Sequence, residues 1–200
     1  MEFTVEQLFG SKVRLRLLRL FLENPEGKFY IREITRLIKA HIHSVRREIS
    51  NLRRLGLIAA KEDDGSEAQT NRRYFEVNQK FLLFTELRNL ILKSQVVLQA
   101  DFARALQTKG EIAYLAFTGS FVSNSESPTD LFIVGKLARD ECRKMVKFME
   151  DELGRAINYT LMTPHEYEQR KKLTDRFIYQ ILENNKIVLI DHLNNSRVIV

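Results

Sequence analysis

The first third of the chain carries the pattern that most constrains its fold. Apolar residues recur at helical spacing in two runs, Ile31, Ile34 and Ile38 and then Val45, Ile49 and Leu52. This spacing places each run on one face of an α-helix. Lys39-Ala40-His41 is expected to form a short connection after the first run, and Ser44 is a residue type that caps helix N-termini. We therefore expect two short helices joined by a tight turn, with Ser44 capping the second.

The residues on either side predict further elements. Val13, Leu17, Leu20 and Phe21 have the spacing of an earlier helix. The segment Asn24-Pro25-Glu26-Gly27 is expected to end it, because proline and glycine favour a turn. Gly56 suits the end of the helix that carries Val45. Residues 57–62 (LIAAKE) and 72–78 (RRYFEVN) are then expected to form two strands around the polar loop 63–71.

The order of three helices and a β-hairpin resembles a known family. The segment FYIREITRLIKAHIHSVRREISNLRRLGLI, followed by RRYFEVN, resembles the winged helix-turn-helix of many prokaryotic transcriptional regulators. The resemblance covers residues 8–78. It implies that the third helix enters the major groove of duplex DNA, with its N-terminal half facing the base edges.

The apolar stripe of the third helix leaves a polar outer face. This face consists of His43, Ser44, Arg46, Arg47, Ser50, Asn51 and Arg54. Arginine can pair with guanine and asparagine with adenine, so Ser44, Arg46, Arg47 and Asn51 are expected to contact bases. Phosphate contacts are expected from Arg54, from Arg72 and Arg73 in the wing, and from Arg14, Arg16 and Arg19 on the first helix.

Two observations bear on this interpretation. Residues 1–100 contain 18 Lys and Arg against 12 Asp and Glu, whereas residues 101–200 contain 14 of each. All of the excess positive charge therefore lies in the first half, as expected for a polyanion-binding part joined to a neutral one. The acidic residues Glu62, Asp63, Asp64 and Glu67 repel phosphate, so the wing is expected to contact DNA only at its base.

The alternative to DNA binding is that the arginines form a solvated face and that the domain binds protein.

A long helix, or two helices end to end, is expected between Asn78 and about Lys109. Its apolar residues are Phe81, Phe84, Leu87, Leu90, Ile91 and Val97. Many winged-helix regulators use such a helix to form dimers, which suits two-fold symmetric half-sites in DNA. The alternative is a helix that simply packs between two domains.

The second half alternates expected strands and helices. The strands are residues 112–117 (IAYLAF), 130–135 (DLFIVG), 157–162 (INYTLM) and 186–190 (KIVLI). One helix places Cys142 on an apolar face with Met145, Val146, Met149 and Leu153, so Cys142 is expected in the core. The last helix is expected to place Leu173, Phe177, Ile178 and Ile181 on its apolar face. The alternation predicts an α/β domain.

This half resembles the minimal nucleotidyltransferases of the DNA polymerase beta superfamily. The resemblance covers residues 99–191 and rests on TGS, DLFIVG and INYTLMTPHEY. In active members a Gly-Ser pair is followed by two acids separated by one residue, and a third acid lies on a neighbouring strand. Residues i and i+2 of a strand face the same way, so the acids together bind two Mg²⁺ ions.

Most of these acids are missing. If Asp130 is the first acid, Phe132 takes the place of the second; if Asp130 is the second, Pro128 takes the place of the first. Asn158 stands at the third position, and Glu126 lies in the loop at the wrong spacing. We therefore expect no nucleotidyl transfer. Gly119, Ser120 and Asp130 are expected to remain as a vestigial nucleotide-binding turn, used either to sense a nucleotide or only in packing and dimerisation.

Together these patterns predict an α+β protein of two domains. Residues 1–79 are expected to form the winged helix-turn-helix, 80–98 a connecting helix, and 99–200 the nucleotidyltransferase-like α/β domain. The expected function is a DNA-binding transcriptional regulator without catalytic residues, metal site or cofactor. Its expected partners are double-stranded DNA and a second copy of the chain. A single cysteine, no signal architecture and no membrane span predict a cytoplasmic protein. The rivals are an active nucleotidyltransferase that modifies protein or RNA, and a protein-interaction module.

Overall fold

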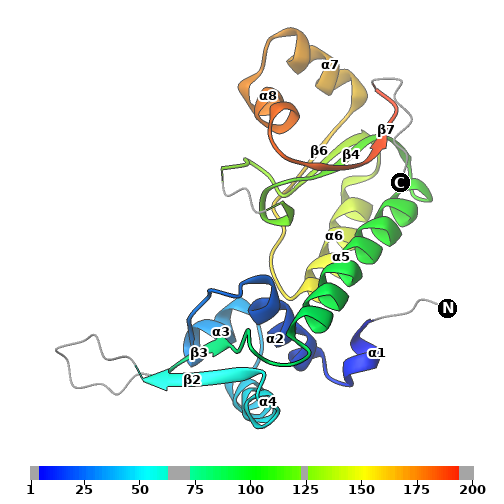
Figure 1. Cartoon of the computed structure of the whole chain (residues 1–200). Helices are drawn as coiled ribbons and strands as arrows, with labels where there is room; N and C mark the ends of the chain where they lie inside the picture. Colours follow the sequence, from blue (N-terminus) through cyan, green and yellow to red (C-terminus); the bar gives the residue numbers. More distant parts are fainter. Residues whose placement is uncertain (1–4, 63–72, 123–125, 194–200) are drawn as a thin grey trace. The chain divides into compact units, whose positions relative to one another are not determined.

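The computed structural model describes residues 5–62, 73–122 and 126–193 (Figure 1). It is a mixed α+β structure with helices and two sheets. The chain divides into two compact units. The first unit comprises Met1–Val97 with Leu153–Arg155, and the second unit comprises Leu98–Glu152 with Ala156–Val200.

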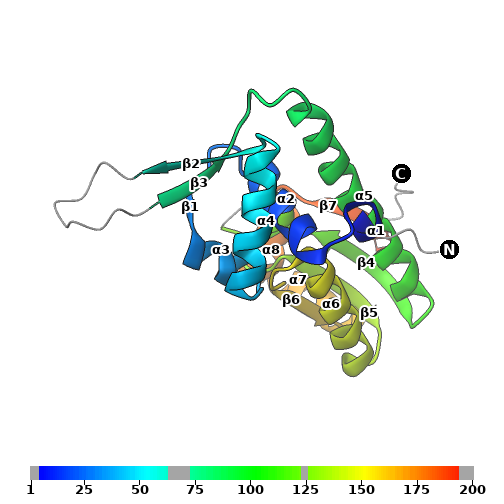
Figure 2. The same cartoon turned by 90° about the horizontal axis from the view of Figure 1, so that it is seen from below.

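The helices of the first unit enclose its core. They are α1 (Val5–Phe9), α2 (Lys12–Glu23), α3 (Ile31–Leu37), α4 (Ile42–Arg54) and the first part of α5 (Phe84–Gln107). The core contains apolar side chains that are almost completely buried, among them Leu15, Leu17 and Phe21 of α2, Ile34 of α3, and Val45, Ile49 and Leu52 of α4. The apolar stripe expected for residues 45–52 is therefore confirmed. Figure 2 shows α3 and α4 side by side.

Helix α4 begins earlier than expected. Its first residue is Ile42 and its N-cap is His41, which has an extended backbone, so the prediction that Ser44 caps the helix is wrong. The cause is the turn after α3, where Lys39 takes a left-handed conformation with φ of 48°. This residue reverses the chain quickly, and the His41 carbonyl already accepts a helical hydrogen bond from the Val45 N–H at 3.0 Å.

The first unit also contains a small antiparallel sheet. Its strands are β1 (Phe29–Tyr30), β2 (Ile58–Glu62) and β3 (Arg73–Val77), in the order β1-β3-β2. The hairpin strands β2 and β3 confirm the expectation. Gly56, with φ of 79°, supplies the left-handed residue that ends the α4 segment. Strand β1 was not expected, because two residues are too few to show an alternating pattern.

Helix α5 confirms the expected long helix as a single element. Residues 78–83 instead form turns, in which the N–H of Phe81 donates to the carbonyl of Asn78 at 3.0 Å. The division between the two units falls within α5, between Val97 and Leu98. In the described part of the chain, no helix combines the length and apolar character that a membrane span requires.

The second unit is built on a four-stranded sheet. The strands are β4 (Glu111–Phe117), β5 (Leu131–Lys136), β6 (Tyr159–Met162) and β7 (Ile187–Asp191), in the order β6-β5-β4-β7. All four confirm expected strands. The pair β5 and β6 is parallel, and β4 is antiparallel to both of its neighbours. The sheet lies between α5 and α6 (Arg139–Leu153) on one face and α7 (Pro164–Lys172) and α8 (Arg176–Glu183) on the other (Figure 1).

The chain between β6 and β7 differs from the single helix expected there. It forms two helices, and Leu173 is the C-cap of α7 with 81% of its surface exposed. The prediction that Leu173 shares a buried face with Ile178 is therefore wrong. Thr174 breaks the helix with φ of 54°, and the Asp175 side chain accepts hydrogen bonds from the first N–H groups of α8.

Cys142 lies in the core of the second unit, as expected from its position on α6. Its side chain is 0% exposed, and burial raises the pKa of the thiol from 9.0 to about 11. The thiol therefore remains protonated at neutral and mildly alkaline pH.

This burial predicts a slow reaction with thiol reagents. At pH 8 the folded chain should react with a disulfide reagent such as DTNB over hours, because the thiol is both inaccessible and neutral. The denatured chain, which has this single cysteine, should release one equivalent of chromophore at once and serves as the control. Immediate reaction of the folded protein would contradict the placement of Cys142.

Candidate nucleic-acid interface

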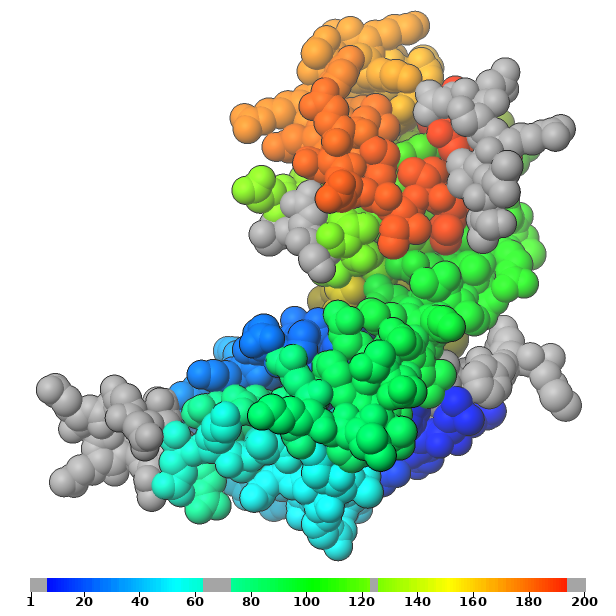
Figure 3. Space-filling view, viewed as in Figure 1, coloured from blue at the N-terminus to red at the C-terminus, as the bar shows by residue number. Residues whose placement is uncertain are grey.

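The outer face of α4 carries the side chains that the sequence singled out. His43, Arg46, Arg47, Ser50 and Arg54 are exposed, and Ser44 and Asn51 are half-buried. The inner stripe of Val45, Ile49 and Leu52 is at most 3% exposed, so the rotational position of the helix is defined. In the space-filling view the segment of α4 and β2, in cyan, lies at the surface of the first unit (Figure 3).

The exposed charges of α4 all have the same sign. Its cationic residues are Arg46, Arg47, Arg53 and Arg54, and all four are exposed. The single acid of the helix, Glu48, is 3% exposed. A helix of this kind fits the width of the major groove, and its arginines can approach bases or phosphates.

Helix α3 adds cations that the sequence analysis missed. Arg32 and Arg36 are exposed and are spaced i and i+4, so they lie on the side opposite Ile34. Lys39, also exposed, follows the helix in a left-handed conformation. The only acid of α3, Glu33, is half-buried and accepts a hydrogen bond from the Tyr30 N–H at 3.3 Å. The helical spacing of these cations was a signal available in the sequence.

The hairpin of β2 and β3 has paired charges. Arg73 is exposed, and its guanidinium lies 3.4 Å from the carboxylate of Glu62. Lys61 pairs in the same way with Glu76 at 2.5 Å. Arg72, Asp63, Asp64 and Glu67 lie outside the described residues. The described part of the hairpin therefore presents less unpaired positive charge than α3 and α4.

The arginines of α2 have partners inside the first unit. Arg14 donates from Nη1 to the Phe9 carbonyl at 3.1 Å, and Arg16 donates from Nη1 to the Ile38 carbonyl at 3.0 Å. Arg19 is 5% exposed, so the prediction that Arg19 contacts phosphate is wrong. Both the apolar side and the polar side of α2 are covered by neighbouring parts of the unit. The sequence pattern showed only the burial of the apolar side.

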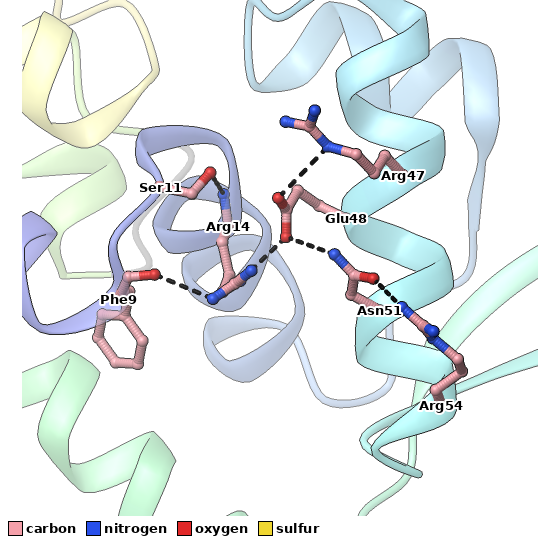
Figure 4. A network of polar contacts seen from close by, with 7 residues as sticks. All are labelled: Phe9, Ser11, Arg14, Arg47, Glu48, Asn51 and Arg54. Atoms are coloured by element: carbon pink, nitrogen blue, oxygen red, sulfur yellow. Dashed lines mark hydrogen bonds and ion pairs between the residues drawn. The ribbon is translucent and has the colours of Figure 1, made fainter.

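A polar network connects α2 to the outer face of α4 (Figure 4). The Glu48 carboxylate accepts a hydrogen bond from Arg14 Nε at 2.9 Å and one from Asn51 Nδ2 at 3.3 Å. The other carboxylate oxygen of Glu48 lies 3.8 Å from Arg47 Nε. Asn51 Oδ1 in turn accepts from Arg54 Nη2. Three of the residues expected to contact DNA, Arg47, Asn51 and Arg54, therefore belong to one connected group.

In the second unit the structure brings Gly119, Ser120 and Asp130 together. Asp130 Oδ1 accepts hydrogen bonds from the Ser120 N–H at 2.8 Å and the Ser120 hydroxyl at 2.7 Å, and Oδ2 accepts from the Asn158 N–H at 2.9 Å. Gly119 has φ of 53°, and a Cβ added there would lie 2.5 Å from Asp130 Oδ1. Glycine is thus required for the turn to close on the carboxylate.

Phe132 and Asn158, the positions compared with the acids of active nucleotidyltransferases, have structural roles. Phe132 is 0% exposed and packs against the rings of Tyr114, Tyr167 and Phe177. Asn158 donates from its side chain to the Pro128 carbonyl at 2.9 Å. Among the described residues, no group of three or more His, Cys, Asp or Glu could hold a metal ion.

The contacts of Asp130 predict a stability effect. Asp130→Ala removes the acceptor of two backbone N–H groups and should lower the free energy of unfolding of the second unit by about 2–4 kcal/mol. Asp130→Asn keeps one acceptor oxygen and should lower the free energy of unfolding by less. Hydrogen exchange of the β5 and β6 amides measures this locally. The matched control is Glu183→Ala, an exposed acid that should change stability by at most about 0.5 kcal/mol. Equal effects of the two alanine variants would contradict this role.

Comparison with known proteins gives limited information. No protein-family model and no curated protein matches the chain. Among solved structures, the chain is similar to a protein from Methanosarcina mazei Go1 described as a possible transcriptional regulator. The two are 15% identical, with a TM-score of 0.35, over 53% of this chain and 88% of that one. At this level of similarity the comparison carries no argument about function.

Proposed function

We propose that the chain is a DNA-binding transcriptional regulator and that its first unit is a winged helix-turn-helix. The observation that carries this proposal is the outer face of α4, where every exposed charged side chain is an arginine. The apolar stripe opposite is buried, so this face is directed away from the core of the unit. A solvated surface helix usually mixes both signs of charge, whereas a duplex-binding surface is strongly positive.

The arrangement around α4 supports the same proposal. Helix α3, a tight turn and α4 are followed by the antiparallel strands β2 and β3, which is the element order of a winged helix. We propose that Ser44, Arg46 and Arg47 contact bases, together with His43 and Ser50 at the same face. Arg54, Arg73 and Arg72 are proposed to hold phosphates, and Arg32 and Arg36 of α3 are added to this set.

Partners and location follow from this function as further proposals. Duplex DNA is the proposed ligand. A homodimer is proposed because Leu90, Val96 and Val97 on α5 are 39%, 60% and 50% exposed, and paired half-sites suit two copies. A regulator that binds duplex DNA in a prokaryotic cell works in the cytoplasm.

We also propose that the second unit is not an enzyme and needs no cofactor. The single acid of the remnant site, Asp130, directs both carboxylate oxygens at donors within the protein. The Ser120 N–H, which a phosphate would require, donates to the same carboxylate. Metal and nucleotide would each have to displace these hydrogen bonds. These contacts favour the packing role over the nucleotide-sensing role.

Duplex binding tests the main proposal. Labelled genomic duplexes are titrated with the wild-type chain by fluorescence anisotropy at two salt concentrations. Binding should fall steeply with salt, since neutralised phosphates release counterions, and should favour some fragments. Arg46→Ala/Arg47→Ala should lose that preference, and Arg47→Ala alone should cost about 1–3 kcal/mol on a favoured fragment if Arg47 contacts a base.

The matched control removes the same charge elsewhere. Arg143→Ala/Lys144→Ala acts on exposed, ion-paired residues of α6 and should leave fragment preference unchanged. An equal loss on all fragments for Arg47→Ala would assign Arg47 to phosphate. No binding by the wild-type chain at low salt would reject DNA binding and favour a protein-interaction module.

Nucleotide chemistry tests the proposal for the second unit. Incubation of the chain with Mg²⁺, labelled nucleoside triphosphates and added RNA should transfer no label to protein or RNA. Equilibrium dialysis with the same nucleotides should detect no binding. Label transfer that Asp130→Ala abolishes and Glu183→Ala preserves, with both variants folded, would establish an active nucleotidyltransferase instead.

A further inference from the structure

Glu48 is a buried acid on the helix proposed to read DNA. Its side chain is 4% exposed, and a buried carboxylate is costly unless donors surround it. Arg14 supplies a charged donor at 2.9 Å and is itself anchored to the Phe9 carbonyl at 3.1 Å. The position of the Glu48 carboxylate is thus defined from α2, a helix outside the proposed contact surface.

From this fixed point the carboxylate contacts Arg47 directly. Arg47 Nε lies 3.8 Å from Glu48 Oε1, while 72% of the Arg47 side chain remains exposed. Figure 4 shows the two terminal nitrogens of Arg47 directed away from Glu48. These terminal nitrogens form the fork that pairs with guanine or phosphate. The ion pair therefore restrains the near end of the guanidinium and leaves its binding end available.

A second connection reaches Arg54 through Asn51. Asn51 donates from Nδ2 to Glu48, and its Oδ1 accepts from Arg54 Nη2. Residues 48, 51 and 54 follow one another at i+3 spacing along one side of α4. Bidentate recognition of adenine would need both polar atoms of the Asn51 amide, and both already have protein partners.

We propose that Glu48, held by Arg14, is a positioning residue for sequence discrimination. It orients Arg47 directly and Arg54 through Asn51, and Asn51 serves as a link rather than as a reader of adenine. This inference rests on the proposed DNA-binding function. An arginine restrained before binding loses less rotamer freedom when it binds, so the network favours the geometry of one set of base contacts.

The charge of Glu48 makes this role separable from simple electrostatics. Loss of an acid beside arginines should, by Coulomb attraction alone, raise the affinity of the chain for every duplex. Loss of a positioning residue should instead lower the affinity for a preferred duplex relative to others. Coulomb attraction alone therefore leaves the ratio of affinities unchanged, whereas loss of a positioning residue lowers that ratio.

The experiment uses the full chain and two duplexes of equal length. One duplex is enriched from a random-sequence pool by the wild-type chain, and the other is unselected. Both are titrated at one salt concentration, since affinities depend strongly on salt. The variants are Glu48→Gln, Arg47→Ala and their combination. Glu48→Gln should lower the ratio of affinities about tenfold, and Arg47→Ala should change the ratio little further in the Glu48→Gln background.

Arg53→Ala is the matched control for the coupling. Arg53 is an exposed arginine of the same helix, and its side chain has no polar partner within the described residues. Substitution of Arg53 by alanine should change the ratio of affinities equally in the wild-type and Glu48→Gln backgrounds.

A second variant guards against misfolding. Arg14→Met/Glu48→Leu replaces the buried ion pair by apolar groups of similar size, which proteins commonly tolerate, and should lose discrimination while it keeps the circular dichroism of the wild-type chain.

The outcomes separate the two levels of the proposal. An unchanged affinity ratio in Glu48→Gln, or additive effects of Glu48→Gln and Arg47→Ala on that ratio, would overturn the positioning role while DNA binding stands. The positioning role would also be overturned if the wild-type chain bound duplexes but enriched no sequence from the random pool. If the wild-type chain binds neither duplex, the proposed function fails and the positioning role fails with it.

Discussion

Burial of one side of α4 is the constraint on which the first unit depends. Val45, Ile49 and Leu52 are at most 3% exposed, and each side chain of this kind contributes about 1.5–3 kcal/mol when buried. Rotation of the helix about its axis would return these side chains to water. Because residues three and four apart share a face, the same burial directs Arg46 and Arg47 outward. The burial that stabilises the first unit therefore also determines which side chains form the proposed binding surface.

Two acids illustrate how a carboxylate organises its surroundings. Glu48 accepts hydrogen bonds from Arg14 and Asn51, and Asp130 accepts them from Ser120 and Asn158. The Glu48 side chain is 4% exposed, so its donors satisfy a charge that would otherwise be costly. Glu48 lies beneath a cationic surface and connects to it. Asp130 is half-exposed, and its oxygens link a turn, a strand and the approach to another strand.

Most of the elements could be predicted from sequence, and the errors have local causes. The stripe of α4, the hairpin strands β2 and β3, α5 and the four strands of the second unit follow from periodicity. The start of α4 was wrong because the left-handed Lys39 shortens the preceding turn. The buried position expected for Leu173 was wrong because Thr174 and Asp175 end one helix and begin another. The predicted contact residues remain predictions, since position on an exposed face allows contact with DNA without demonstrating it.

The sequence by itself determined which residues form helices and strands and which faces turn inward, because apolar burial requires only that side chains share a side. Tertiary structure alone decided the polar partners. Arg14 and Glu48 are 34 residues apart, and Asp130 and Asn158 are 28 apart. A hydrogen bond requires its atoms to meet within a few tenths of an ångström and in the right direction. No periodic pattern encodes that condition, so only the folded chain shows that Glu48 connects α2 to the arginines of α4.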